Sequence, residues 1–340
     1  MRKLLCAFAV LSLLACSQPG NQYVQISGYA QGGTYTVKLN MKGIQVPVET
    51  VRDSIDALIL RIDNTLSGYN KKSLLSRFNE GEKIPSTEMF LDMYRMSYQW
   101  WERSGGALDF AAAPLYDAWG FGFKNSSFPS DEEIAALLEK VGMGHLPAEL
   151  PVVDGYIDPA SVGYPRLNYN AIAQGYSCDI IARYLYGIGV RDMLVNIGEI
   201  WCDGLSPTGQ PWSVGIDRPD DEPASDEEAL EGVWNSEGKP CGIVTSGNYR
   251  KFYIRDGRKY AHTINPVTGY PVQHNLLSAT VVSAGSAAES DAVATWCMVI
   301  GLEEARQLIL GDPALEGYLI YSDDKGEMKE WASPGFTLRE

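Results

Sequence analysis

The spacing of apolar residues along the chain changes between a helical and an alternating period. Apolar residues three or four positions apart predict a helix over 48–66. The same period predicts helices over 73–78, 86–103, 172–187, 287–300 and 302–310, and a capping box at Ser130–Glu133 predicts the start of another. Alternating residues over 23–39, around a glycine pair, predict a β-hairpin. Short apolar or strand-like runs predict strands at 150–157, 166–169, 193–200, 212–216, 241–245, 250–254, 277–283, 318–322 and 328–331.

The order of these elements indicates the fold class. Strands occur in runs instead of alternating regularly with helices, which favours an α+β fold over a doubly wound sheet. We expect mixed sheets with packed helices, in one large unit of two tightly packed lobes spanning 23–335. The hydrophobic fraction of 45% is sufficient for a sizeable core. Residues 219–239, rich in Glu, Asp, Pro and Gly, are expected to form a surface insertion.

The first residues have the pattern of a targeting segment. A basic start is followed by an apolar run to Ala15, which is too short to span a bilayer. The sequence Leu-Leu-Ala before Cys16 matches a bacterial lipobox, whereas an ordinary signal peptide with an incidental cysteine is the alternative. We therefore expect a lipoprotein signal peptide at 1–15, lipidation of Cys16, a tether at 16–22 and anchoring on the extracytoplasmic side of a bacterial membrane.

Net charge narrows the possible ligands. The formal charge of −15 argues against nucleic acid, whose binding requires basic surfaces. An acidic protein that holds a pyrophosphate is expected to need a cation. The cysteines beyond Cys16 have no zinc-ligand spacing. Cys178 and Cys297 are expected to be buried free thiols, and pairing of Cys202 with Cys241 remains open.

Two segments in the C-terminal third contain candidate catalytic groups. Asp291 and Thr295 are four residues apart, so a helix places both oxygens on one face, as a Mg²⁺ site requires. The alternative is a capping carboxylate and a half-buried threonine. His262, one of three histidines, precedes a Pro-x-Thr-Gly turn and is the nearby group that titrates close to neutrality.

Three earlier segments could contact a nucleotide. Residues 168–176 lead from a strand-like stretch into a helix, whose free N–H groups suit a phosphate. Residues 106–110 form a candidate nucleotide-contacting loop, and Tyr69 offers a ring for stacking. Taken singly, each of these segments is equally compatible with an ordinary turn.

Taken together and in this order, the motifs resemble the ApbE family of FAD:protein FMN transferases. The resemblance covers roughly residues 23 to 335. It depends most on His262-Thr263-Ile264-Asn265-Pro266-x-Thr268-Gly269 and Asp291-Ala292-x-Ala294-Thr295, with support from Leu66-Ser67-x-Tyr69, Gly106-Ala107-Leu108-Asp109, Asn168-x-x-Ala171-Ile172-Ala173-Gln174-Gly175 and Thr245-Ser246-Gly247-Asn248.

The resemblance implies a reaction and a site. FAD is the substrate, Mg²⁺ the cofactor, and FMN passes to a Thr or Ser hydroxyl of an acceptor flavoprotein subunit with release of AMP. Asp291, Thr295 and the carbonyl of Ala171 are the implied metal ligands, and His262 is the candidate base. The implied FAD contacts are Gly32, Tyr69, Ala107, Leu108, Asp109, Asn168, Gln174 and Ile264. A Mg²⁺-dependent FAD pyrophosphatase and an FAD-binding lipoprotein without transfer are the competing hypotheses.

The chain departs from the family pattern near the expected phosphate site. Asn168, Tyr169, Asn170 and Gln174 stand where the family usually has Asp, Leu, Gly and Lys. One charge of each sign is lost, so the local sum is unchanged. Gln174 can still donate a hydrogen bond, but without the assistance of a positive charge. Gly198-Glu199 replaces the usual glycine pair and predicts an altered loop.

Overall fold

The computed structural model describes residues 22–122, 128–219, 230–248, 252–255 and 258–339. The expected signal peptide, Cys16 and all but the last residue of the tether lie outside these ranges, and remain predictions from sequence. Within the described residues, no helix is both long enough and apolar enough to cross a bilayer.

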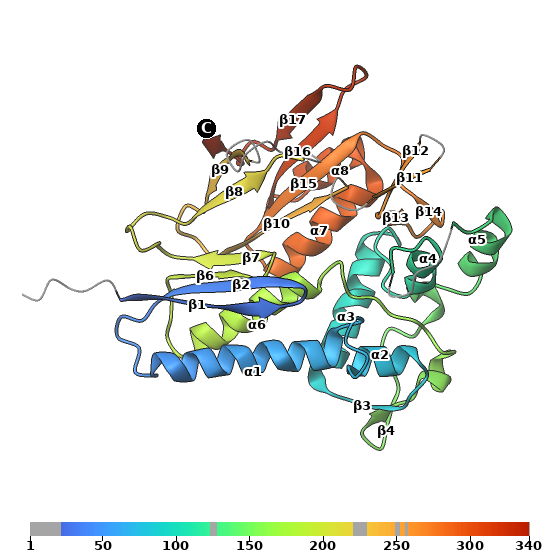
Figure 1. The fold of residues 1–340 in the computed structure, drawn as a ribbon, viewed down its shortest axis with the longest axis horizontal. Coiled ribbons are helices and arrows are strands. Elements are labelled where there is room, and N and C mark those ends of the chain that lie inside the picture. Colours follow the sequence, from blue (N-terminus) through green and yellow to red (C-terminus); the bar gives the residue numbers. More distant parts are fainter. Residues whose placement is uncertain (1–21, 123–127, 220–229, 249–251, 256–257, 340) are drawn as a thin grey trace, which may run out of the picture.

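One antiparallel sheet forms the centre of the fold (Figure 1). Each of its strands is antiparallel to its neighbours. In spatial order, the strands are β1 (Tyr23–Ala30), β2 (Gly33–Asn40), β6 (Met193–Asn196), β7 (Ile200–Asp203), β10 (Cys241–Gly247), β15 (Leu276–Ser283), β16 (Leu315–Ser322) and β17 (Met328–Ala332).

The edge hairpin β1–β2 confirms the prediction from alternating residues. Ala30 pairs with Gly33 across a two-residue turn in which Gln31 and Gly32 have φ of 51° and 85°. Positive φ at both turn residues is the geometry that matches the twist of a tight hairpin.

Four helices cover one face of the central sheet (Figure 1). They are α1 (Val48–Leu66), α6 (Ala173–Gly187), α7 (Ala287–Ile300) and α8 (Leu302–Gly311). The predicted helices over 48–66 and 287–300 are confirmed, and those predicted over 172–187 and 302–310 differ from α6 and α8 by one residue at an end. Buried residues of β1, β2 and β6 pack against α1 and α6, whereas β15 and β16 pack against α7 and α8.

The opposite face of the sheet packs against a small sheet of β8 (Ser213–Asp217), β9 (Leu230–Asn235) and β18 (Leu338–Arg339). Strand β9 belongs to the stretch that we expected to be a surface insertion. Its Trp234 is buried among apolar residues of the main sheet, so 230–235 is part of the fold. Residues 220–229 of that stretch lie outside the described ranges.

Two other strand predictions are wrong in detail. The expected strand over 193–200 is the hairpin β6–β7, because Gly198 adopts φ +97° and its N–H bonds to the Asn196 side chain. The stretch 166–169 forms no strand. Its Leu167 backbone instead bonds to both polar atoms of the Asn79 side chain, at 2.7 and 2.8 Å.

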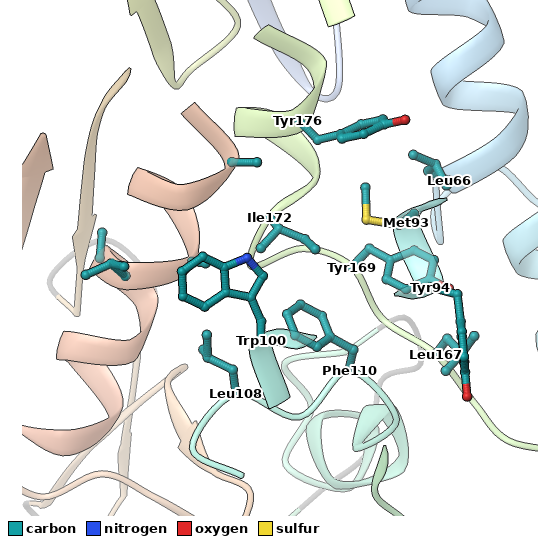
Figure 2. Close-up of a cluster of buried hydrophobic side chains, with 14 of the residues drawn as sticks. Leu66, Met93, Tyr94, Trp100, Leu108, Phe110, Leu167, Tyr169, Ile172 and Tyr176 are labelled. Carbon is teal, nitrogen blue, oxygen red and sulfur yellow. The ribbon is translucent and has the colours of Figure 1, made fainter. Parts of the chain in front are cut away.

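The remaining elements lie beside the helical layer (Figure 1). The largest is α3 (Glu88–Arg103). Its aromatic and methionine side chains pack against the segment before α6 and the loop after α3 in a hydrophobic cluster (Figure 2). The others are α2 (Leu74–Asn79), α4 (Ala113–Ala118), α5 (Asp131–Leu138), β3 (Ile84–Pro85), β4 (Val152–Val153), β5 (Tyr156–Ile157), β11 (Phe252–Arg255), β12 (Arg258–Ala261), β13 (Ile264–Asn265), β14 (Tyr270–Pro271) and 3₁₀ turns at Met143–His145 and Pro159–Val162.

The start of α7 is wedged between two glycines. A Cβ on Gly175 of α6 would lie 2.3 Å from the Ala287 carbonyl oxygen, and a Cβ on Gly242 of β10 would lie 2.5 Å from the Ala287 Cα. Asp179 of α6 accepts hydrogen bonds from the amides of Ala287 and Ala288 at 2.8 and 3.0 Å. Helix α7 is therefore held directly against α6 and β10.

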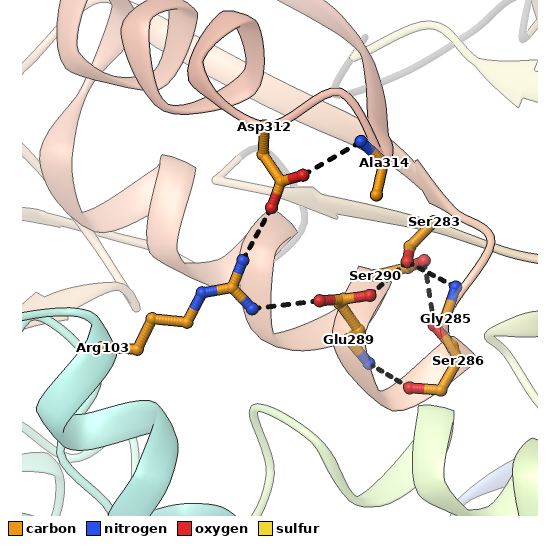
Figure 3. A network of polar contacts seen from close by, with 8 residues as sticks. All are labelled: Arg103, Ser283, Gly285, Ser286, Glu289, Ser290, Asp312 and Ala314. Carbon is orange, nitrogen blue, oxygen red and sulfur yellow. Dashed lines mark hydrogen bonds and ion pairs between the residues drawn. The ribbon is translucent and has the colours of Figure 1, made fainter.

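A charged network fixes the same helix from the side of α3 (Figure 3). Arg103 donates to Glu289 of α7 at 3.0 Å and to Asp312, just after α8, at 2.9 Å. Ser286 caps α7 by accepting from the Glu289 amide at 2.9 Å. The network joins the end of α3 to α7 and to the end of α8, with partners that lie 186 and 209 residues further along the chain.

We expect Gly175→Ala to destabilise the protein by about 1–3 kcal/mol, because the new methyl group overlaps the backbone of α7. Gly187→Ala is the matched control. It lies at the end of the same helix with no atom within 4 Å of its added Cβ. The control should match or exceed wild-type stability by up to about 1 kcal/mol in urea unfolding. Equal stabilities for the two variants would contradict the wedge.

Candidate active site

A cavity of about 690 Å³ opens where α6, α7 and the loops beside them meet. This volume lies within the range of about 300–1,000 Å³ that is typical of cofactor and ligand pockets. Its lining includes Tyr69, Leu108, Asp109, Asn168, Ala171, Gln174, His262, Asp291 and Thr295, which are residues that the sequence predicted for the site.

Three predicted contacts lie outside the described lining: Gly32, Ala107 and Ile264. Ile264 is fully buried in a separate cluster around Leu115 and Trp119, so its side chain serves packing. Gly32 lies at the tip of the β1–β2 hairpin, where neighbouring Gln31 donates to Ser177 of α6 at 2.6 Å. The contacts with FAD that the sequence predicts for Gly32, Ala107 and Ile264 stay predictions.

Asp291 is the most unusual ionisable group in the cavity. It lies on α7, is 4% exposed, and accepts a hydrogen bond from the Gly175 amide at 3.0 Å. Burial raises the pKa of its carboxyl well above the ordinary value, and the negative Glu199 nearby raises it further. A buried carboxylate facing a second carboxylate favours a bound cation.

Glu199 is a site residue that the sequence reasoning missed. The Gly198-Glu199 departure indicated only an altered loop, but the β6–β7 turn places Glu199 in the cavity wall. Its carbonyl accepts from the Ile197 amide at 2.9 Å and from the Cys178 thiol at 3.1 Å. The signal available in the sequence was an acidic residue in a glycine turn between two buried strands.

Gln174 holds that turn in place. Its amide group donates to the Ile197 carbonyl at 3.0 Å, and a Cβ on Gly198 would lie 2.6 Å from its nitrogen. The side chain that replaces the family's usual lysine therefore positions the loop of Glu199 as well as lining the cavity.

Neutral oxygen donors complete this wall of the cavity. The hydroxyl of Thr295, one turn after Asp291 on α7, lies 3.4 Å from the Ser246 hydroxyl on β10. Ala171 lines the cavity directly before α6. Carboxylate, hydroxyl and carbonyl oxygens are the donors that Mg²⁺ prefers.

Tyr69 and the loop after α3 also line the cavity. Tyr69 is 63% exposed, and Asn170 donates to its hydroxyl at 3.3 Å. The largely buried Asp109 accepts from the amides of Ala111 and Met143 at 2.9 and 3.0 Å. Burial raises the pKa of the Asp109 carboxyl, while these amides oppose the rise. Asp109 thus shapes the loop in addition to lining the cavity.

His262 lies between β12 and β13 and lines the cavity together with Thr263. Its half-buried ring lies edge to face with Phe121, with 6.4 Å between the ring centroids. The structure therefore brings the imidazole into the same cavity as the Asp291 carboxylate.

Comparison with known proteins shows the family of this chain. The family model for the ApbE family matches residues 31–319. The FAD:protein FMN transferase of Vibrio cholerae is 32% identical, over 99% of this chain and 98% of its own. The protein of the same name from Escherichia coli is 34% identical, over 85% and 80% of the two chains.

Solved structures give the same result. The V. cholerae flavin transferase ApbE matches with a TM-score of 0.76 and 29% identity, over 92% of this chain and 97% of its own. The apo flavinyl transferase ApbE of Pseudomonas stutzeri matches with a TM-score of 0.77 and 28% identity, over 92% and 95%. The α+β fold class is confirmed, and the chain belongs to the ApbE family.

We expect Asp109→Ala to destabilise the protein by about 1–3 kcal/mol, because the amides of Ala111 and Met143 lose a buried acceptor. Asp109→Asn is the control, since it keeps one acceptor oxygen and should lose clearly less. Urea unfolding of both variants measures the difference. Unchanged stability of Asp109→Ala would show that these bonds do not hold the loop.

Proposed function

We propose that this protein is an FAD:protein FMN transferase that uses Mg²⁺ to move FMN from FAD to a Thr or Ser hydroxyl of an acceptor protein, releasing AMP. The observation that carries the proposal is the meeting, in one cavity, of buried Asp291, Thr295 and His262 from the two family-specific motifs. The names of the relatives support the reaction class.

The donor set fits a divalent cation. Asp291, Thr295 and the Ala171 carbonyl would hold it, and Glu199 adds a second negative charge in the same cavity. A cation there relieves the charge of the buried Asp291. When bound, Mg²⁺ neutralises the diphosphate of FAD, which the carboxylates of this cavity would otherwise repel.

Other residues of the cavity lining orient the FAD molecule. The exposed ring of Tyr69 offers a stacking surface for the isoalloxazine, and the Asn170 amide fixes its hydroxyl. Asn168 and Gln174 line the cavity near the start of α6, where they can donate hydrogen bonds to phosphate oxygens. These contacts hold the diphosphate for in-line attack.

His262 accepts the proton in the transfer step. The acceptor hydroxyl oxygen attacks the phosphorus of the FMN half, and its proton passes to the imidazole. The bond between that phosphorus and the bridging oxygen breaks, so the oxygen leaves with AMP. An imidazole suits this role because its ordinary pKa lies near neutrality.

The acceptor is a flavoprotein subunit of a membrane redox complex that has a flavinylation motif. Lipidation of Cys16 would place the transferase at the same membrane surface, on the extracytoplasmic side. No role toward nucleic acid is proposed, in agreement with the acidic composition.

The direct test uses the protein lacking residues 1–16, incubated with FAD and Mg²⁺, with and without an acceptor that contains the flavinylation motif. We expect an acceptor heavier by one FMN and an equal amount of AMP, measured by mass spectrometry and chromatography. Free FMN with AMP and an unmodified acceptor would indicate a pyrophosphatase. Intact FAD bound to the protein would indicate storage.

Asp291→Asn should weaken Mn²⁺ binding at least about 100-fold, since even outer-shell changes typically cost 10- to 100-fold. The fold should persist, because the variant removes a buried charge without changing the side-chain shape. Asp203→Asn is the matched control: a half-buried carboxylate on β7 that accepts from the Tyr186 hydroxyl and does not line the cavity. Titration calorimetry with Mn²⁺ compares the two. Equal Mn²⁺ affinities of the two variants would show that Asp291 is not a metal ligand.

His262→Ala should slow the transfer step about 10²- to 10⁴-fold, the usual contribution of a general base. FAD affinity should stay close to the wild-type value because the imidazole acts on the acceptor hydroxyl. Single-turnover transfer and FAD fluorescence titration measure the two effects separately. Undiminished single-turnover transfer would exclude His262 as the base.

A further inference from the structure

Two cysteines lie directly opposite each other in the central sheet. Cys202 on β7 and Cys241 on β10 are register partners in the antiparallel pair. Their Sγ atoms are 3.7 Å apart. Opposed residues of antiparallel strands have Cα atoms about 4.5–5.5 Å apart, inside the range of about 4.4–6.8 Å that a disulfide requires. The backbone is therefore already suitable for a covalent link.

The surroundings of the two sulfur atoms are apolar. Cys202 is 0% and Cys241 5% exposed, and both belong to the cluster between the main sheet and the β8–β9–β18 sheet. The contact with the adjacent Cys202 thiol, together with burial, raises the pKa of the Cys241 thiol well above its usual value. A neutral disulfide fits such a site without creating a charge.

The other two described cysteines have different environments. Cys178 of α6 donates its thiol to the Glu199 carbonyl at 3.1 Å, and Cys297 lies inside α7. Among the described cysteines, Cys202 and Cys241 therefore combine a directly opposed register, a short sulfur separation and a shared apolar site.

We propose that Cys202 and Cys241 are oxidised to an intrachain disulfide when the exported protein folds. Two S–H bonds break and one S–S bond forms, and the two protons and two electrons pass to the disulfide of a thiol–disulfide oxidoreductase, which becomes a dithiol. The inference requires the export expected from the N-terminal sequence, and it does not depend on the transferase reaction.

The link would clamp two strands of the active site. Strand β7 begins directly after Glu199, and β10 runs from Cys241 to the cavity residues Thr245, Ser246 and Gly247. The bond would close the chain between residues 202 and 241, which includes β8 and β9. Such a closure stabilises chiefly by restricting the unfolded chain.

The first test counts thiols in the protein lacking residues 1–16, exported to the periplasm by a fused cleavable signal peptide and purified without reductant. The protein is unfolded in guanidinium with iodoacetamide, and its mass and peptides are analysed. We expect alkylation of Cys178 and Cys297 alone, and one linked peptide pair joining Cys202 to Cys241. Alkylation of all four cysteines, both here and after refolding with oxidised glutathione, would overturn the proposal. A linked pair of any other composition would do the same.

The second test separates the bond from the packing of the sulfur atoms. Reductant should lower the Tm of the wild type and of Cys297→Ala, the matched control with one buried thiol removed. It should leave the Tm of Cys202→Ala/Cys241→Ala unchanged, whatever the starting value of that variant. An equal effect of reductant on all three proteins would contradict the disulfide. Flavin transfer measured in parallel reports on the proposed function separately.

Discussion

Where α6 meets α7, the backbone of Gly175 lies against the Ala287 carbonyl, and the Gly175 amide donates to the Asp291 carboxylate. Any side chain at position 175 would separate the two helices and withdraw this donor. The backbone of Gly242 on β10 approaches Ala287 almost as closely from the side of the sheet. The position of Asp291 in the cavity thus depends on backbone contacts that only glycine permits.

The remaining parts of the site are arranged around that contact. The Arg103 network and the Asp179 cap fix the start of α7, so that Asp291 and Thr295 face the cavity. Gln174 orients the turn that carries Glu199. The fold therefore places the carboxyl groups of Asp291 and Glu199 in one cavity, where burial and their mutual repulsion raise the pKa of Asp291 and a bound cation would relieve the repulsion.

The sequence predicted the elements with a clear period and the residues in specific motifs. Helix α7 and the β1–β2 hairpin are examples, as is the placing of Asp291 and His262 in one cavity. It did not predict the break between β6 and β7, because the single exposed Gly198 interrupts an otherwise apolar run without any other turn signal. The role of Asn79 in bonding the Leu167 backbone was also missed, since the two residues are 88 positions apart. Long-range side-chain to backbone bonds have no local signature.

Helices α6 and α7, which both line the cavity, lie far apart in the sequence, and this separation determines when the cavity forms during synthesis. The Gly175–Asp291 bond joins residues 116 positions apart, and α7 is among the last elements of the chain. A nascent chain that has already formed α6 and the loops beside it still lacks one wall of the cavity. The cavity is consequently complete only after synthesis is nearly finished, when α7 packs against α6.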